Sequence, residues 1–579
     1  MIYVKLLSCC LMLSVILDLA LKCLCYADDD PKVCTHDAGC YIGTRMDGYQ
    51  SGEFDAFMGI PYSFPPARFE APSRYKSNKT HIVKKLQFDC MQKNYLLPNR
   101  PISGSEDCLF LNVYRPLNIV DPLPVMVYIF GGGFFAGSSS PIFVGPEYIM
   151  DHGNIILVTF GYRLGAFGFL STGDDILPGN LGLKDQNMAL RWVYSYIGFF
   201  GGDRYRVTLF GQSAGAVSAH MHMLSKISQH LFYGIIAISG TANVPFNIDE
   251  TPEYTFRQTA KYANISNWDT KSTERLAYEL QNVHPYVLLN AGDGLKYWDV
   301  DNMVNYRPVI EKPGPFAFLD KHPVKSMRSG DYTPVPIMFG RVPKEGGVRV
   351  VAIMESDKLR NEFNAHFNDY LRRFLEFPKN FTVSQQIEKV NLVIKEYFDD
   401  VRELNNQTRE GFMDMVTDRG FYHPLYHAVK MFVNRIDTTK NPLYMYEFNY
   451  LGSYTYAHFY AGHVTDYEYG VVHCDDLVYL FRAPRIIPDF DKGSVEAGVI
   501  KEYVGDLVHF AQLRRPKVHK KFRECNRDTF YPGEGKICDY HEFINGMDFT
   551  SLDIKINDAF DTRRMKFWDD ILDPKKHMY

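Results

Sequence analysis

The sequence predicts an α/β fold with a mostly parallel central sheet and helical insertions. Three observations support this prediction: short apolar runs without polar alternation, glycine-rich turns after those runs, and helical stretches between them. Strands that are buried on both faces appear as continuous apolar runs, and their alternation with helices is typical of a parallel sheet. The clearest candidate strands are Val125–Phe130, Ile155–Phe160, Val207–Phe210 and Ile235–Ser239.

The segment 382–398 predicts a helix outside this strand pattern, with Ser384 as its expected N-cap. Its apolar residues recur with the period of an amphipathic helix; they are Ile387, Val390, Ile394 and Tyr397. We expect helical insertions to fill 245–330 and 346–440. Because no repeat, low-complexity tract or obvious linker follows residue 30, the sequence favours one domain over 28–579 rather than two.

Composition excludes several classes of protein. Apolar residues make up 46% of the 579 residues and charged residues 23%, so the chain can bury a large core and is not of the disordered class. The formal net charge is −5, and there is no long block of Lys or Arg. A polyanion would therefore find no basic field, and we expect no nucleic-acid partner.

The first 27 residues predict a cleaved signal peptide. Lys5 precedes a weakly polar to apolar run, and the segment ends at Ala27 before three aspartates. A membrane anchor is the alternative, but Asp18 and Lys22 interrupt the run, and a span needs about 20 apolar residues. The C-terminal segment has neither a lipid-anchor signal nor a retention ending. We therefore expect a secreted protein without a stable membrane anchor.

Cysteines and sequons agree with a secretory route. Seven cysteines follow the expected cleavage site, and three close pairs suggest themselves, which leaves Cys474 odd; the pairs are Cys34 with Cys40, Cys90 with Cys108, and Cys525 with Cys538. Spacing alone does not establish these pairings. Four Asn-x-Ser/Thr sequons are candidate glycosylation sites on the surface: Asn78, Asn264, Asn380 and Asn406.

The strongest local motif lies at Val207–Ala216, where a short strand runs into Gly-x-Ser-x-Gly and then into a helix. This is the nucleophile elbow of α/β-hydrolases, in which a sharp turn exposes the serine hydroxyl above the sheet. The motif alone is a common accident, but the preceding strand and following helix strengthen it. Ser213 is therefore the candidate nucleophile.

Gly131-Gly132-Gly133 follows the candidate strand that ends at Phe130. A hydroxyl that attacks an ester creates negative charge on the carbonyl oxygen, so the site needs backbone N–H donors there. A phosphate-binding loop is the alternative, but the Gly-Lys-Ser/Thr pattern is missing. We expect the oxyanion donors to come from this glycine loop and from Ala214, the residue after the nucleophile.

The serine also needs a base and an acid, which this fold supplies in the order serine, acid, histidine. Glu345 lies in a glycine-flanked turn after the apolar run 335–339, and His473 lies in a later loop. Spacing alone does not select these two from 18 histidines and 68 carboxylates, and His463 is an alternative base by position.

The chain resembles the carboxylesterase and cholinesterase family from about Tyr41 to Asp569. Matching stretches occur in the same order at Gly59–Tyr62, Ser105–Val113, Tyr162–Gly165, Pro178–Gln186 and Phe200–Asp203. The resemblance implies the following roles: Ser213, Glu345 and His473 form the triad, Gly132, Gly133 and Ala214 donate to the oxyanion, and Cys90 and Cys108 form a disulfide.

Two departures from the family bear on the substrate. Many family members have His before the three glycines, where this chain has Phe130. Cholinesterases carry a tryptophan in the first disulfide loop to hold the choline cation, but 91–107 contains none, and Tyr95 is its only aromatic residue. A choline ester is therefore disfavoured.

Within the family the elbow 211–216 is similar to that of insect juvenile hormone esterases, through Gln212 and Ala216, while His473-Cys474-Asp475-Asp476-Leu477 is as similar to secreted insect β-esterases. We expect a secreted serine carboxylesterase that hydrolyses neutral esters, possible substrates being juvenile hormone or another apolar ester, without a metal or cofactor. The alternatives are a broad-specificity detoxifying esterase and a catalytically inert cell-adhesion relative. The expected partner is a small-molecule ester.

Overall fold

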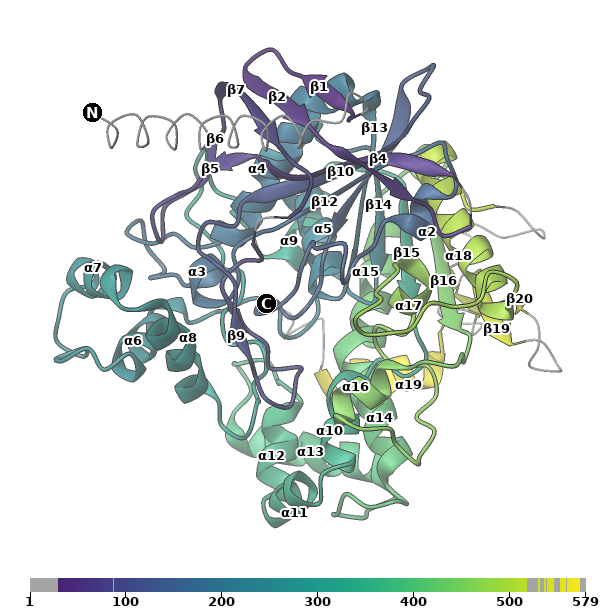
Figure 1. Ribbon diagram of the computed structural model, residues 1–579. Helices are drawn as coiled ribbons and strands as arrows, with labels where there is room; N and C mark the ends of the chain where they lie inside the picture. The colour runs from purple at the N-terminus through teal and green to yellow at the C-terminus, as the bar shows by residue number, and fades with distance from the viewer. Residues whose placement is uncertain are drawn as a thin grey trace, which may run out of the picture.

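The computed structural model describes residues 30–50, 52–86, 88–517, 530–531, 536–537, 539–545, 552–558 and 560–572. Its centre is an eleven-stranded sheet, shown in Figure 1 with helices around it. In spatial order the strands are β20 (Leu552–Asp558), β19 (Asp539–Asn545), β16 (Leu443–Asn449), β15 (Ile337–Arg341), β14 (Gly234–Ile238), β13 (Gly202–Gln212), β11 (Leu123–Ile129), β12 (Ile156–Phe160), β10 (Phe110–Pro116), β4 (Glu53–Pro61) and β3 (Thr44–Asp47).

The middle of this sheet is parallel, from β12 to β19, and the outer pairs at both edges are antiparallel. The predicted α/β architecture is therefore confirmed. Strand β11 lies between β12 and β13, so the chain leaves it to one side first and returns to the other. Such a switch point opens a crevice at the carboxyl ends of the strands, which is where ligands bind in open α/β sheets.

Helices cover both faces of the sheet (Figure 1). Helices α4 (Leu181–Tyr196) and α5 (Ala214–Leu224) pack against β13, and α2 (Glu147–Met150) and α18 (Val495–Leu513) pack against the sheet from the opposite side. Strands β11, β12 and β14 are buried along nearly their whole length, as continuous apolar runs require.

The two expected helical insertions are present. The first contains α6 (Pro252–Tyr262), α7 (Thr273–Asn282), α8 (Pro285–Ala291) and α9 (Pro323–Ser329). The second contains α10 (Gly347–Met354), α11 (Asp357–Ala365), α12 (Phe367–Phe374), α13 (Val383–Phe398), α14 (Arg409–Thr417), the π-helix η4 (Asp418–Tyr422) and α15 (His423–Val433). Helices α16 (Tyr456–Ala461), α17 (Leu477–Leu480) and α19 (Thr562–Leu572) follow them.

The N-cap expected for the helix at 382–398 was wrong by two residues. Thr382, not Ser384, caps α13, because its side chain accepts a hydrogen bond from the backbone of Gln385. The Gln385 side chain in turn accepts one from the Thr382 N–H. This reciprocal capping box satisfies two backbone donors that Ser384 would leave free.

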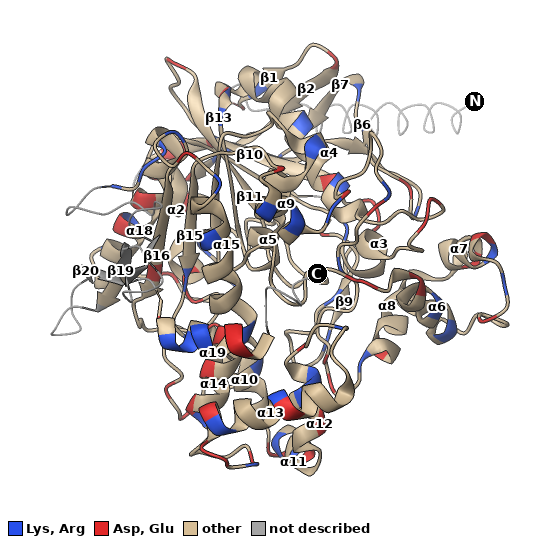
Figure 2. Cartoon of the chain, turned by 180° about the vertical axis from the view of Figure 1, so that it is seen from behind, with Lys and Arg blue, Asp and Glu red and all other residues tan. Residues whose placement is uncertain are grey.

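Two hydrophobic clusters fill the interior. The larger cluster contains the sheet and its flanking helices, and the smaller one joins α10 to α14 with α16 and α19. In Figure 2 acidic and basic residues are interspersed along the outer helices, including α13 and α19, in keeping with the small net charge.

Among the cysteines that the structure describes, two disulfides join Cys34 to Cys40 and Cys90 to Cys108, and Cys474 is a free thiol. The four sequon residues, Asn78, Asn264, Asn380 and Asn406, are all exposed. The expected signal peptide and the pair Cys525 and Cys538 lie outside the described residues. Of the helices that the structure describes, none combines the length and the apolar character needed to cross a membrane.

Candidate active site

Ser213 stands between β13 and α5 in a backbone conformation that residues other than glycine rarely adopt, with φ 57° and ψ −125°. The flanking glycines make this turn possible. A Cβ at Gly211 would lie 2.5 Å from backbone atoms of Gly215, and one at Gly215 would lie 1.9 Å from the Ile129 carbonyl oxygen. Only glycine fits at both positions, so β13 and α5 can approach closely enough to present the serine.

The glycine loop after β11 faces this turn. Gly132 and Gly133 both have positive φ, of 101° and 60°, which favours glycine. Within the described part of the chain, neither of their N–H groups donates a hydrogen bond to another residue. Ala214 begins α5, where the helix dipole is positive. The three predicted oxyanion donors are therefore available on adjacent elements at the switch point.

Glu345 and His473 are brought together although 128 residues separate them. His473 Nδ1 lies 2.5 Å from Glu345 Oε2, and both side chains are buried, with 2% and 0% exposure. The other carboxylate oxygen of Glu345 accepts from the Val342 N–H at 3.0 Å. A buried carboxylate fixed in this way orients the imidazole and stabilises its protonated form.

The tautomer of His473 follows from its two neighbours. Gln212 Nε2 lies 3.1 Å from His473 Nε2. An amide nitrogen can only donate, so Nε2 is the acceptor and Nδ1 carries the proton that Glu345 accepts. This tautomer is the one that a general base requires. Ser213 and His473 line the same cavity, and within the described residues no hydrogen bond joins their side chains.

Three supports of the histidine loop were not identified from the sequence. Tyr460 donates to the His473 carbonyl at 2.9 Å, and the Lys344 N–H donates to the Val471 carbonyl at 3.1 Å. Asp475 accepts from the N–H groups of Val472 and Tyr456 at 2.8 and 2.6 Å. The acidic run after His473 was the only signal for these contacts, because the partners lie on remote segments.

Burial by itself would lower the pKa of His473, but Cys474 and Glu345 raise it, and the net direction is upward from the usual value. Glu345 contributes both through its hydrogen bond and through its charge. His473 is therefore protonated more readily than a free histidine, and the hydrogen bond from Gln212 belongs to its neutral form.

A cavity of about 150 Å³ contains Ser213, Gly132, Gly133 and His473. Its wall is mainly apolar and is supplied largely by the two helical insertions; apolar lining residues include Leu96, Phe135, Phe246, Met303, Val348, Phe374, Met415 and Phe421. The ring of Phe421 lies 5.0 Å from that of His473. Such a cavity suits an apolar ester.

The charged residues of the cavity wall have partners of their own. Arg349 pairs with Asp301 at 2.6 Å, and Arg419 donates to the backbone carbonyls of Leu375 and Glu376. The alternative base His463 does not line the cavity; it pairs at 3.4 Å with Glu355 and is more than half exposed.

A model of the carboxylesterase family matches residues 29–534. A juvenile hormone esterase of Tribolium castaneum is 35% identical over 94% of this chain and 93% of its own. Venom carboxylesterase-6 of Apis mellifera is 33% identical over 93% of this chain and 94% of its own. A crystal structure of juvenile hormone esterase from Manduca sexta, with OTFP covalently attached, covers 94% of this chain and all of its own, with TM-score 0.79 and 23% identity. That likeness shows the α/β-hydrolase fold.

Proposed function

Since this chain belongs to the carboxylesterase family and is a carboxylic ester hydrolase, we propose that it is a secreted serine esterase acting on neutral, apolar esters through Ser213, His473 and Glu345. The observation that carries the proposal is the single cavity that contains Ser213, the glycine loop and the buried His473–Glu345 pair.

In the first half of the reaction, Ser213 Oγ attacks the ester carbonyl carbon and His473 Nε2 takes the hydroxyl proton. The negative charge moves to the carbonyl oxygen, where the N–H groups of Gly132, Gly133 and Ala214 receive it. The C–O bond to the alcohol then breaks as His473 returns its proton to the leaving oxygen. Glu345 stabilises the imidazolium throughout.

In the second half, water repeats these steps on the acyl-enzyme. His473 takes a proton from the water, and the resulting hydroxide attacks the acyl carbon. Breaking the bond to Ser213 Oγ releases a carboxylic acid and restores the serine proton from His473. The sum is ester plus water to acid plus alcohol, so the cycle consumes no other reactant.

The expected preference for neutral esters depends on whether a choline cation could bind to Tyr95, the sole aromatic residue of the first disulfide loop. Lys296 Nζ lies 3.8 Å from the centre of the Tyr95 ring, and Lys93 Nζ lies 5.8 Å from it. Burial lowers the pKa of Lys296 to about 7, but in either protonation state its amine covers that face of the ring. A quaternary ammonium group would have to displace it, so this family position offers no cation-π partner to choline.

Among apolar esters, juvenile hormone is the specific candidate, and the similarity to the juvenile hormone esterase of Tribolium castaneum supports it. Secretion is supported by the signal-like segment 1–27, by the two disulfides and by the four exposed sequons. We also propose that 28–579 form one domain, since one sheet includes strands from β3 to β20.

The nucleophile is tested by Ser213→Ala. We expect turnover to fall by roughly 10⁴ to 10⁶ while the variant stays folded and is secreted as well as the wild type. A matched control is Ser228→Ala, because Ser228 is buried outside the catalytic cavity and bonds His222 and Asn187. Turnover near the wild-type value in Ser213→Ala would refute the assignment.

The substrate is tested with a panel of esters. Catalytic efficiencies for a juvenile hormone methyl ester, a naphthyl acetate, acetylcholine and the isosteric neutral acetate would be compared. We expect the ratio for acetylcholine over its neutral isostere not to exceed one. A strong preference for the hormone supports a hormone esterase, and equal rates across neutral esters support a broad-specificity enzyme.

A further inference from the structure

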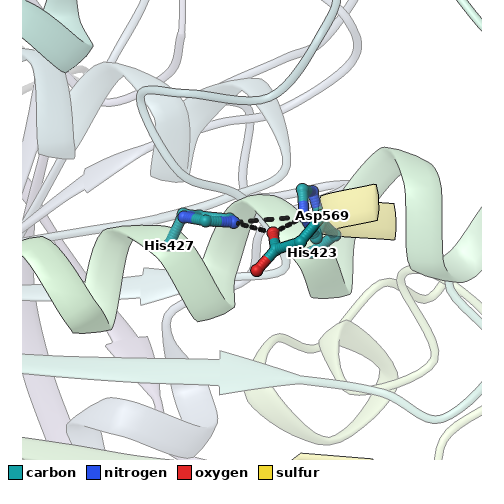
Figure 3. Close-up of side chains that lie close together, drawn as sticks. All are labelled: His423, His427 and Asp569. Carbon is teal, nitrogen blue, oxygen red and sulfur yellow. Dashed lines mark hydrogen bonds and ion pairs between the residues drawn. The ribbon is translucent and has the colours of Figure 1, made fainter. Parts of the chain in front are cut away.

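Three side chains outside the catalytic cavity converge on one point. His423 and His427 lie one turn apart on α15, so their rings project from the same side of the helix. Asp569 approaches both rings from α19 and lies 142 residues after His427 in the sequence (Figure 3). The two Nε2 atoms lie 2.8 and 2.6 Å from the same Asp569 Oδ1 and 3.1 Å from each other.

Two neutral imidazoles and an ionised carboxylate cannot form hydrogen bonds along all three of these contacts. Each neutral imidazole presents either an N–H or a lone pair at Nε2, and an ionised carboxylate oxygen only accepts. If both rings donate to Asp569, their two N–H groups face each other at 3.1 Å. If only one donates, a lone pair of the other ring faces the carboxylate. A cation in the centre would be attracted to all three atoms at once.

We propose that His423 Nε2, His427 Nε2 and Asp569 bind a divalent transition-metal ion of the Zn²⁺ type. Zn²⁺ binds imidazole nitrogen and carboxylate oxygen at about 2.0–2.2 Å, so that neighbouring ligand atoms of a tetrahedral site stand about 3.3–3.6 Å apart. The separation of 3.1 Å between the two Nε2 atoms is close to this range, and the two contacts of Asp569, at 2.8 and 2.6 Å, would lengthen by up to about 1 Å around an ion. Two nitrogens and one oxygen favour Zn²⁺, Co²⁺ or Ni²⁺ over Ca²⁺ and Mg²⁺, which prefer oxygen ligands.

The surroundings allow an ion to enter and to complete its coordination. His423 and Leu572, the last residue of α19, line a cavity of about 740 Å³ that is separate from Ser213. The side chains of His423 and His427 are 2% and 10% exposed, and that of Asp569 is 27% exposed. Water molecules can therefore occupy the remaining coordination positions.

The site would join α19 to the wall of the catalytic cavity. Helix α15 continues directly from η4, which supplies Arg419, Gly420 and Phe421 to that wall. Helix α19 already contacts η4 through an ion pair of Arg564 with Asp418 at 2.5 Å. A metal ion bound by His423, His427 and Asp569 would be a second link between the two segments, about one helical turn beyond the ion pair of Arg564 with Asp418. We therefore assign the ion a structural role.

The experiment uses untagged full-length protein that has been stripped of metal with a chelator and dialysed. Equilibrium dialysis with elemental analysis should find one Zn²⁺ per chain, and Co²⁺ should give visible absorption from the bound ion. Backbone amides of α19 should exchange hydrogen up to about 100-fold more slowly at a Zn²⁺ concentration 100 times the dissociation constant. Ca²⁺ and Mg²⁺ should have no such effect.

Two variants and one control test the assignment to these residues. Asp569→Asn and His427→Gln should each lose Zn²⁺ binding and the slowed exchange, and both should retain ester hydrolysis because neither residue lines the catalytic cavity. His463→Gln should bind as the wild type does, since His463 has a single carboxylate partner. Substoichiometric Zn²⁺ binding by the wild type, or undiminished binding by both variants, would overturn the proposal.

Discussion

The basicity of His473, the proposed base, depends in part on Glu345, which raises the pKa of His473 together with Cys474. Glu345→Gln should lower turnover by about 10⁴-fold, the loss typical of removing the triad acid, because the amide no longer favours the correct tautomer or the imidazolium. It should also shift the pH dependence. The pKa of His473 is raised in the wild type, so activity is lost as pH falls through that raised value; without the carboxylate the acidic limb should move to lower pH.

The measurement for Glu345→Gln is a pH profile of catalytic efficiency for a neutral ester. The control is Glu355→Gln, since Glu355 pairs with the exposed His463 away from the cavity. An acidic limb that stays in place in Glu345→Gln would mean that another group sets the pKa of His473.

Asp476, three residues after His473, makes stability depend on pH. Burial, and next the charge of Glu345, raise its pKa to about 7, and its Oδ1 atom has no hydrogen-bond partner among the residues that the structure describes. The folded state therefore holds a proton that the unfolded carboxyl releases at about pH 4, and the free energy of unfolding falls as pH rises from about 4 to about 7.

Asp476→Asn should remove this contribution. The difference in Tm between pH 5 and pH 8 should shrink, with the gain in stability at pH 8, where the wild-type aspartate is charged and buried. The pKa of Asp475 is also raised, so Asp475 would still contribute to the pH dependence of stability in this variant. A pH dependence of Tm equal to that of the wild type would show that Asp476 is charged at little cost in the fold.

At the scale of elements, the elbow tolerates no side chain beside the serine. Gly215→Ala would place a Cβ 1.9 Å from the Ile129 carbonyl oxygen and force α5 away from β11. We expect the variant to fold poorly and to be inactive. Gly498→Ala in α18 is the matched control, because its Cβ would meet nothing within 4 Å. The alanine should stabilise that helix by about 1 kcal/mol. Normal activity in Gly215→Ala would contradict the packing argument.

The inner strands of the parallel sheet were largely predictable because they are buried along most of their length. The run 155–160 corresponds to β12 within one residue, and 235–239 to β14 within one residue at each end. The run 207–210 recovers only the inner part of β13, whose first residues are partly exposed and polar and therefore carry no apolar signal.

The site was less predictable from residues alone. Ser213 and the glycine loop have local signatures, because strand, turn and helix are contiguous there. Glu345 and His473 do not, since their contact depends on where the loops after β15 and β16 converge, and only the family resemblance selected them. The cavity wall and the cover over Tyr95 come from insertions whose packing no periodicity describes.

At the scale of the whole molecule, the Cys90–Cys108 disulfide should contribute to stability by restricting the unfolded chain. A bridge that spans 18 residues is worth about 3 kcal/mol in the loop-entropy model. The double substitution Cys90→Ser with Cys108→Ser should therefore lower Tm measurably. The same double substitution at Cys34 and Cys40, six residues apart, should lower it less. An equal or reversed order would show that strain or packing outweighs chain entropy.

The contact between α19 and η4 also has a consequence for biosynthesis. Ribosomes deliver Ser213, Glu345 and His473 before Arg564 and Trp568. A nascent chain can therefore assemble the loops of the proposed triad while Asp418 of η4 accepts from Tyr397 but still lacks Arg564. Chains interrupted between His473 and α19 would contain every residue of the proposed triad and yet leave Asp418 and Tyr397 without Arg564 and Trp568, and so accessible to chaperones. Docking of α19 would then be the step at which a completed chain becomes distinguishable from an unfinished one.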